Sequence, residues 1–321
     1  MRFSHTFGAI TSYMVAARRT AHLIANSKSG KGMGESLPDL AKRLAQESGI
    51  ALTHHSTENP AEFEKQIERA VAAAEKEGGT VIAAGGDGTI RSVAQVAAGR
   101  KVAMGVVACG TFNFFARGLK IPEDCEEGMR LALTGEVRAV RLGRVNEHYF
   151  LINASLGLYA KSIRDREKST SRFGRNRLVV IISTMASLFS RHRKLDVELA
   201  TENERTRVKT LSIFIGNNAL QLRDLALDVA RCMKKNLLAV VVLRPVGKME
   251  MLRILFRGFT KTLEHEERLE TFCVDSLSID LSQHLVTVAL DGEMFQMKTP
   301  LKVEAVPGAV NLVLPPLETP V

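Results

Sequence analysis

A glycine-rich turn with a single carboxylate interrupts the sequence at residues 85–89, Gly-Gly-Asp-Gly-Thr. Because glycine has no Cβ atom, an anionic ligand can approach the main chain closely at such a turn. The N–H groups and dipole of the helix that follows favour phosphate there. A carboxylate repels phosphate unless a metal ion, a cationic partner or a substrate hydroxyl accompanies it, so Asp87 is expected to serve one of these. A helix-capping turn with an exposed Asp87 is the alternative interpretation.

Two further polar turns have the same character. Residues 26–32, Asn-Ser-Lys-Ser-Gly-Lys-Gly, follow a short apolar run. Residues 110–117, Gly-Thr-Phe-Asn-Phe-Phe-Ala-Arg, combine a glycine with hydroxyl and amide groups, and Arg117 is a candidate phosphate contact. The aromatic pair Phe114 and Phe115 in this turn is equally compatible with core packing.

Two carboxylates stand two residues apart near the end of the chain, in Asp291-Gly292-Glu293 after an apolar run. Two carboxylates this close together form a candidate functional pair. Asp-Gly is also the strongest short signal for a hairpin turn, and by itself this dipeptide favours the turn interpretation.

The elements that must position these turns alternate between strand and helix up to residue 108. Strands are expected at 21–25, 50–55, 80–84 and 102–107, with helices after Ser36, after Asn59-Pro60 and after the glycine turn. This alternation predicts a doubly wound parallel sheet with helices on both faces. Ligands of such sheets bind at the carboxyl ends of the strands, so the three polar turns should gather at one edge.

After residue 135 the pattern becomes rich in β-strands, which predicts an antiparallel sandwich or barrel. Helical stretches are expected at 176–190 and 248–267, and a cleft is expected between the two halves. The chain should divide near residues 135–146. Strands are expected at 137–145, 149–154, 195–200, 207–215, 237–243, 272–281, 285–290 and 301–305.

Composition excludes several classes of protein. The 321 residues are 45% hydrophobic and 25% charged, which suits one large or two ordinary globular domains. The four cysteines form no CxxC pair and the eight histidines form no HExxH, so neither a disulfide framework nor a zinc site is expected. Tryptophan is absent and aromatics are only 5%, which argues against stacking on single-stranded nucleic acid.

The net charge of +9 is concentrated in residues 161–194, where ten Lys or Arg face two acids. This excess favours an anionic partner, and a membrane surface is preferred to nucleic acid. Residues 248–263 combine basic and apolar side chains in the same way, although packing on the sandwich with solvated charges is the alternative there. The longest apolar run, 178–189, is shorter than the roughly 18–20 residues of a membrane span, so a soluble chain is expected.

Taken in order, NSKSGKG, GGDGT, GTFNFFARGLKIP and LDGE resemble the diacylglycerol kinase catalytic family over residues 21 to 315. This family includes bacterial lipid kinases and the sphingosine and ceramide kinases. NAD kinases and phosphofructokinases share the glycine-Asp-glycine turn, but the GTxNxFAR block and the late DGE separate them and point to a lipid substrate.

The resemblance implies an α/β nucleotide-binding domain at 20–138, a β-sandwich domain at 139–315, and a site for ATP and Mg²⁺ between them. Asp291 matches the general base, Glu293 would support it or the metal, and Asp87 would act beside the phosphates, also through Mg²⁺. The residues implied in nucleotide binding are Asn26, Ser29, Gly30, Gly85, Gly86, Gly88, Thr89, Gly110, Thr111 and Asn113.

Two positions depart from the family pattern. Many members carry Asp where this chain has Phe114, which removes one acid from the network that helps to hold magnesium. Many also carry Asp-Gly, part of a structural metal site, where this chain has Lys234-Lys235. A lysine ammonium group cannot bind Mg²⁺, so its charge replaces the ion or the site is lost.

The function expected from these residues is ATP-dependent transfer of phosphate to the hydroxyl of a diacylglycerol-like or sphingoid lipid. The expected location is the cytoplasmic face of the membrane, through 161–194 and 248–263. Two alternatives stay open: a catalytically weak regulatory protein that binds nucleotide and lipid, and a soluble-metabolite kinase of the NAD kinase type. The sequence does not indicate an oligomeric state.

Overall fold

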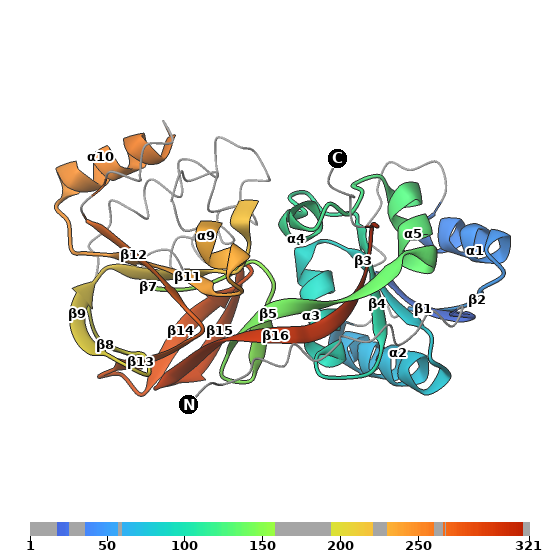
Figure 1. Ribbon diagram of the computed structural model, residues 1–321, viewed down its shortest axis with the longest axis horizontal. Coiled ribbons are helices and arrows are strands. Elements are labelled where there is room, and N and C mark those ends of the chain that lie inside the picture. The colour runs from blue at the N-terminus through green and yellow to red at the C-terminus, as the bar shows by residue number, and fades with distance from the viewer. Residues whose placement is uncertain are drawn as a thin grey trace, which may run out of the picture.

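The computed structural model describes residues 18–25, 36–56, 60–157, 194–220, 230–259, 266 and 268–316. Figure 1 shows an α/β lobe and a β-sandwich lobe, with two strands running from one to the other. These strands are β5 (Glu136–Val145) and β16 (Leu301–Leu314). The expected class, a parallel α/β unit followed by an antiparallel sandwich, is therefore confirmed.

The first lobe contains four parallel strands in the order β2-β1-β3-β4. Strands β3 and β4 are buried along their whole length and have almost continuous apolar sequences, as expected when helices cover both faces of a sheet. The strands are β1 (Thr20–Ala25), β2 (Ala51–His55), β3 (Thr80–Gly85) and β4 (Ala103–Ala108).

Helices cover both faces of this sheet. Helices α1 (Leu37–Glu47) and α5 (Cys125–Thr134) share one hydrophobic cluster with the sheet, and α2 (Phe63–Glu77) and α3 (Asp87–Ala97) share the other. Ser36 caps α1 as expected, and the turn η1 (Pro60–Glu62) precedes α2. Helix α5 and the short α4 (Phe114–Gly118) were not expected from the sequence.

The second lobe packs two antiparallel layers around a single cluster of apolar side chains. One layer is a separate sheet in the order β12-β11-β10-β7-β14-β15, and the other continues the sheet of the first lobe through β16, β13, β8 and β9. Its strands, beyond β5 and β16, are β6 (His148–Phe150), β7 (Asn153–Gly157), β8 (Leu195–Ala200), β9 (Arg205–Thr210), β10 (Ser212–Gly216), β11 (Leu238–Leu243), β12 (Leu269–Val274), β13 (Ser276–Leu281), β14 (Leu285–Leu290) and β15 (Glu293–Lys298).

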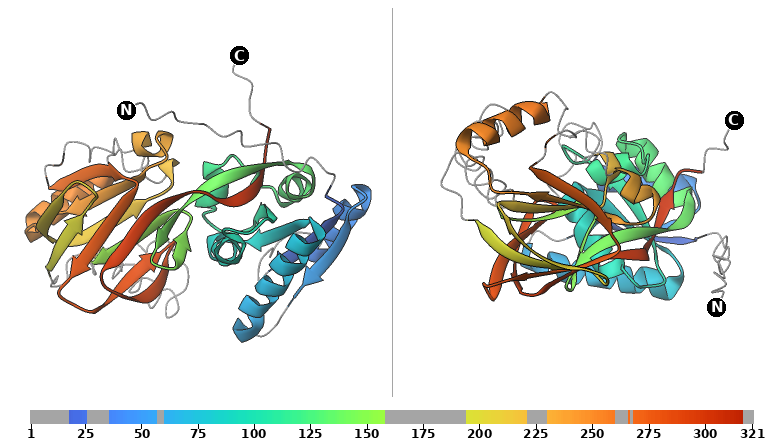
Figure 2. Two further views of the ribbon diagram at one scale, coloured as in Figure 1. Left: turned by 60° about the horizontal axis from the view of Figure 1, so that its bottom comes forward. Right: turned by 60° about the vertical axis from the view of Figure 1, so that its left-hand side comes forward.

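Strand β16 belongs to both lobes. It pairs in parallel with β4 at one end and antiparallel with β13 at the other, while β5 runs beside it for most of its length. Both views in Figure 2 show this pair passing from the sandwich into the α/β lobe. The division expected between residues 138 and 139 falls within β5 and stays a proposal.

Several strand boundaries differ from expectation. The expected strands 207–215 and 272–281 are each two strands in different sheets, separated only by Leu211 and by Asp275. The expected strand 149–154 likewise divides into β6 and β7, and β15 was not expected at all. β16 continues past Pro307-Gly308 to Leu314, because a register shift between Val306 and Val310 accommodates these two residues within the strand.

Of the expected helix 248–267, the structure describes α10 over Lys248–Phe259, and residues 260–265 lie outside the described residues. The stretch 176–190 lies outside the described residues. Within the described residues, no helix combines the length and apolar character needed to span a bilayer.

The expectation that the cysteines form no disulfide is wrong. Cys232, on the short helix α9 (Ala230–Lys234), is bonded to Cys273 on β12, 41 residues away. The two meet because α9 leads directly into β11, and β12 pairs with β11. Spacing along the sequence does not reveal such a contact. Cys109 and Cys125 are free thiols whose sulfur atoms lie 2.8 Å apart.

Candidate active site

The two described glycine turns meet at the carboxyl edge of the parallel sheet. The N–H of Cys109 donates to the carbonyl of Gly85 at 3.0 Å. This bond holds the start of the second turn, at Cys109, against the end of β3, at Gly85. A Cβ atom on Gly110 would lie 2.6 Å from the Cα of Gly86, closer than any real contact. This close approach requires glycine at position 110.

Asn113 closes the second turn upon itself. It is 5% exposed and has a φ of 49°, in the left-handed region that asparagine tolerates better than most residues. Its side-chain oxygen accepts the N–H of Gly110 at 2.9 Å, and its amide nitrogen donates to the carbonyl of Gly110 at 3.2 Å. The amide of Asn113 therefore shapes the turn, and its contact with a nucleotide stays a prediction.

Asp87 joins the two turns. It is the first residue of α3, and its carboxylate accepts the backbone N–H groups of Phe114 and Phe115, each at 3.3 Å. Burial raises the pKa of Asp87, while these two hydrogen bonds act in the opposite direction. Each carboxylate oxygen accepts one long bond, which leaves lone pairs for a cation beside a phosphate.

Phe114, which stands where the family often has Asp, connects the lobes through its main chain. Its carbonyl accepts the side-chain amide of Asn218, from the sandwich lobe, at 2.8 Å. A Cβ atom on Gly118 would lie 2.5 Å from the same amide nitrogen, so α4 and Asn218 are in close contact.

Asp291 occupies the turn between β14 and β15. It and Gly292 have φ values of 48° and 94°, so the Asp-Gly dipeptide forms the hairpin turn that its sequence indicates. The carboxylate of Asp291 accepts three consecutive N–H groups of the segment that leads into β7, at 2.7, 2.8 and 2.9 Å. The donors are Leu151, Ile152 and Asn153.

The basicity of Asp291 reflects two opposing effects. Burial is the larger and raises its pKa to about 6, while the three amides and the charge of Arg91 favour the ionised form. A carboxylate with this pKa is a better proton acceptor near neutral pH than an ordinary aspartate. The turn interpretation and the catalytic interpretation of Asp291-Gly292 are thus compatible.

Glu293 lies against the first turn of α3. A Cβ atom on Gly88 would be 2.8 Å from its carboxylate, and Arg91 of the same helix forms an ion pair with it. The second motif, GGDGT, and the fourth, LDGE, therefore lie against each other, although 202 positions separate the two members of the ion pair.

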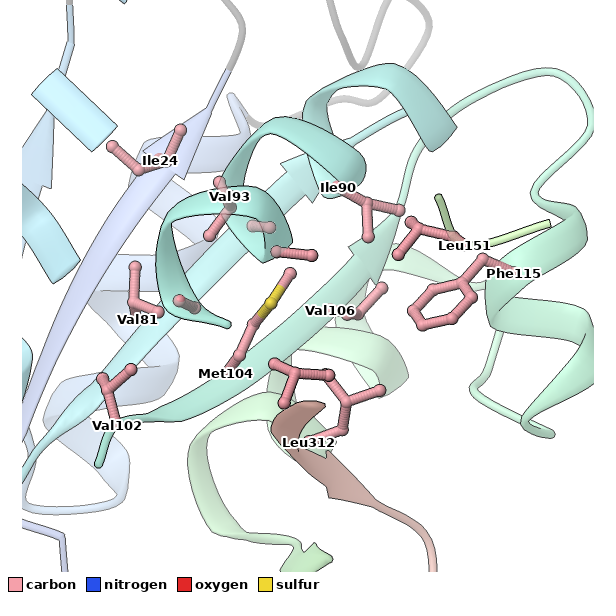
Figure 3. Packing of buried hydrophobic residues seen from close by; sticks show 14 of the residues in the cluster. Ile24, Val81, Ile90, Val93, Val102, Met104, Val106, Phe115, Leu151 and Leu312 are labelled. Atoms are coloured by element: carbon pink, nitrogen blue, oxygen red, sulfur yellow. The ribbon is translucent and has the colours of Figure 1, made fainter. Parts of the chain in front are cut away.

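One apolar cluster supports both aspartates. Phe115 and Leu151, whose N–H groups donate to Asp87 and Asp291 respectively, both belong to it. Figure 3 shows these two side chains together, beside Ile90 of α3 and Val106 of β4. The spacing of the two carboxylates is thus set by close packing, which resists small displacements.

The structure does not bring the other expected site residues into the contacts described above. Thr89 is half-buried, Thr111 is exposed, and Arg117 forms an ion pair with Glu123 at 3.2 Å. Asn26, Ser29 and Gly30 lie outside the described residues. Nothing in the sequence pattern singled out Arg91 or Asn218. The only sequence feature that could have drawn attention to Arg91 was its position as a charged residue between the apolar residues 90 and 93 of a predicted helix.

Of the two metal sites implied by the resemblance, the residues fit one and do not fit the other. Within the described part of the chain, no three acidic, histidine or cysteine side chains gather as a metal site. Mg²⁺ beside phosphates commonly uses only one or two carboxylates, so Asp87 fits that role. The structural site near Lys234-Lys235 does not fit, because the guanidinium of Arg141 donates to the carbonyl of Leu237 at 3.1 Å and the side-chain oxygen of Asn217 at 3.0 Å. These oxygens thus bind a cationic side chain.

Comparisons with known proteins agree with this architecture. Residues 20–145 match the diacylglycerol kinase catalytic domain, and residues 155–314 match the YegS C-terminal NAD kinase beta sandwich-like domain. A crystal structure of a diacylglycerol kinase from Bacillus anthracis superposes with a TM-score of 0.66 at 15% identity, over 93% of this chain and 97% of that chain. That likeness shows the fold.

Curated relatives also align over most of this chain. A Klebsiella pneumoniae protein named "Probable lipid kinase YegS-like" is 28% identical over 89% of this chain and 94% of its own length. The uncharacterized protein sll0036 of Synechocystis is 25% identical over 94% of this chain and 72% of its own length. By class, then, the protein is a lipid kinase. It belongs to the diacylglycerol kinase catalytic family, as its ordered motifs predict.

Proposed function

We propose that this protein transfers the γ-phosphate of ATP to the hydroxyl of a lipid, with Asp291 as the general base. The observation that carries the proposal is the placement of Asp291. Its turn lies against the start of α3, because the neighbouring Glu293 forms an ion pair with Arg91, and its pKa is raised to about 6. An alcohol is a poor nucleophile until its proton is removed, and a positioned base contributes about 10²- to 10⁴-fold to the rate.

The nucleotide phosphates are proposed to bind at the paired turns, residues 85–89 and 110–113. Support comes from the glycines, which leave the main chain open, and from the helix N-terminus behind them. Asp87 is the proposed Mg²⁺ ligand. The metal would neutralise the charge that develops on the phosphates.

The lipid requires that the enzyme reach a membrane surface, and α10 supports this in part. Met249 and Leu252 are 78% and 41% exposed, while Met251 and Ile254 of the same helix are buried in the sandwich lobe. Arg253 and Arg257 both form ion pairs with the buried Glu266, at 3.1 Å. Contact through α10 is therefore proposed to depend on its apolar side chains more than on its charge.

The remaining membrane contact is proposed to come from the basic stretch 161–194, most of which lies outside the described residues. Through these segments we propose that the protein acts at the cytoplasmic face of an anionic membrane. The lipid is proposed to be a diacylglycerol-like or sphingoid molecule, since each presents a hydroxyl group next to acyl chains.

The decisive experiment measures transfer of labelled phosphate from ATP to a panel of lipids in mixed micelles, with and without Mg²⁺. The panel contains diacylglycerol, monoacylglycerol, a sphingoid base, ceramide and phosphatidylglycerol. We expect one lipid to be labelled by the wild type and its labelling to fall at least about 100-fold in Asp291→Asn. Intact activity in that variant would reject Asp291 as the base. No labelling of any lipid, with ATP binding retained, would favour the regulatory binding protein.

A further inference from the structure

Helix α3 carries two side chains, one helical turn apart, that reach into the sandwich lobe. The side chain of Gln95 donates to the carbonyl of Glu147 at 2.9 Å and accepts the N–H of Tyr149 at 2.8 Å. Arg91, four residues earlier on the same face, reaches the hairpin β14–β15. The helix that begins at the phosphate-binding turn is thus attached to the second lobe at two points.

Arg91 is held on two sides by the same strand. Its guanidinium forms the ion pair with Glu293 and lies 4.9 Å from the centre of the Phe295 ring, two residues further along β15. Alternate residues of a strand share one face, so both contacts come from a single surface of β15. Arg91 is 6% exposed, so this contact is buried at the arginine end, while Glu293 is 47% exposed.

The arrangement is not the one that stability alone would favour. The Nε of Arg91 is buried and has no hydrogen-bond partner within the described part of the chain. A buried charge with an incompletely satisfied donor is costly, and such costs are typically retained where a site needs a fixed geometry. The ion pair also directs one carboxylate oxygen of Glu293, Oε2, towards Arg91.

We propose that Arg91 is a positioning residue for phosphoryl transfer, holding Glu293 and the Asp291 turn at a fixed distance from the phosphate-binding turn. The proposal rests on the proposed function and deepens it, because it assigns Glu293 to a contact between lobes. Arg91 touches neither substrate in this scheme and acts only through the β14–β15 hairpin.

The chain offers a matched control. Arg144 on β5 forms an ion pair with Glu304 on β16, and its guanidinium lies 5.8 Å from the Tyr149 ring. The pair has the same chemistry as Arg91–Glu293 but involves no residue of the proposed site. Comparison of Arg91→Met with Arg144→Met therefore separates loss of an arginine–glutamate pair from loss of this particular contact.

The test measures kcat, KM for ATP and KM for lipid in Arg91→Met, Glu293→Gln, the double variant and Arg144→Met. We expect Arg91→Met to lower kcat about 10- to 100-fold, since displacement of a reacting group by 1 Å costs rates of this order. Both KM values should change little, and the double variant should be no slower than Arg91→Met. A fall in kcat no greater than that of Arg144→Met, or additive losses in the double variant, would overturn the proposal.

A second readout does not depend on catalysis. Hydrogen exchange should quicken at the amides of Leu151, Ile152 and Asn153 in Arg91→Met and in Glu293→Gln, because a released hairpin loosens its Asp291 carboxylate from them. Exchange at the same amides should stay unchanged in Arg144→Met.

This measurement also separates the positioning role from the proposed function. If the wild type phosphorylates no lipid, the proposed function fails, but the exchange rates still decide whether Arg91 holds the hairpin. Unchanged exchange in both variants would overturn the positioning role. Glu293→Gln, altered at a half-exposed position, serves if Arg91→Met does not fold.

Discussion

At the scale of single residues, the two aspartates of the site are bound in the same manner by different parts of the chain. Asp87 accepts two consecutive main-chain N–H groups and Asp291 accepts three. Each carboxylate therefore organises a neighbouring segment as well as offering an oxygen to a ligand. For Asp291, burial favours the protonated carboxyl group, whereas the three main-chain hydrogen bonds and the proposed role as a base both favour the ionised form.

The pH dependence of stability should reveal this conflict. In the unfolded chain Asp291 ionises near its ordinary value of 3.8, and in the folded protein near 6. The raised value means that the protonated form stabilises the folded state. This contribution is complete below about pH 4 and is lost as the pH rises through 6, at a cost of at most about 3 kcal/mol. Asp291→Asn should therefore gain stability relative to the wild type between pH 4.5 and 7.

Urea unfolding at several pH values measures this difference. The exposed Gln296, changed to Ala, is the control: it removes no ionisable group, so its difference from the wild type should be the same at every pH. A constant difference between wild type and Asp291→Asn would contradict the assigned ionisation. In the wild type, kcat/KM should rise with pH through about 6, as the base becomes ionised.

At the scale of elements, the site consists of turns whose glycines are not equivalent. A Cβ atom on Gly110 would meet main-chain atoms at 2.6 Å, whereas one on Gly86 would lie at an ordinary 3.5 Å. Gly110→Ala should lower the melting temperature and ATP affinity together. Gly86→Ala should leave the melting temperature within a few degrees of the wild type but weaken ATP binding, since the added methyl group would stand between the paired turns proposed to bind the phosphates.

Differential scanning fluorimetry and ATP titration distinguish these two variants. Equal destabilisation by both substitutions would show that the close approach of the two turns is not a feature of the folded protein. Unchanged ATP affinity in Gly86→Ala would place the nucleotide elsewhere.

Helix α10 allows a separate prediction about the membrane. Because Met249 is 78% exposed, Met249→Glu should not alter thermal stability, but it should weaken binding to anionic vesicles by several fold through loss of apolar contact. Sedimentation with vesicles of phosphatidylglycerol and phosphatidylcholine measures the binding. Leu285→Glu, on an exposed residue of β14, is the control. If both variants bind like the wild type, α10 does not contact the membrane.

The sequence predicted most elements of the α/β lobe because strand and helix differ there in period, and Pro, Ser and Gly mark their ends. It failed at corners of the sandwich, where one residue, Leu211 or Asp275, separates strands of different sheets without changing the alternation. The glycine turns and the carboxylates of the site are local signals and were identified. Arg91, Asn218 and the Cys232–Cys273 bond depend on contacts between distant segments, which no local pattern encodes.

At the scale of the whole molecule, the lobes share a sheet, and this should govern how the protein unfolds. β16 pairs with β4, β5 and β13, so loss of either lobe removes partners from the other. We expect a single calorimetric transition with equal van't Hoff and calorimetric enthalpies. Leu312→Asp, at a buried position of β16 paired with β4, should destabilise both lobes together.

Two resolved transitions would show that the lobes unfold independently. Tryptophan is absent from the chain, so a probe can be introduced in each lobe without background. Val140→Trp beside the first lobe and Leu285→Trp in the second should report the same midpoint.

The path of β16 also has a consequence for biosynthesis. The ribosome releases β1 to β4 first, but the strand that covers the outer edge of β4 comes more than 190 residues later, at Asn311 and Leu312. Until then β4, which is wholly apolar and buried in the finished protein, keeps an open edge. The nascent chain therefore exposes an unpaired, aggregation-prone strand edge through most of its synthesis. Protection by a chaperone would matter most during that interval.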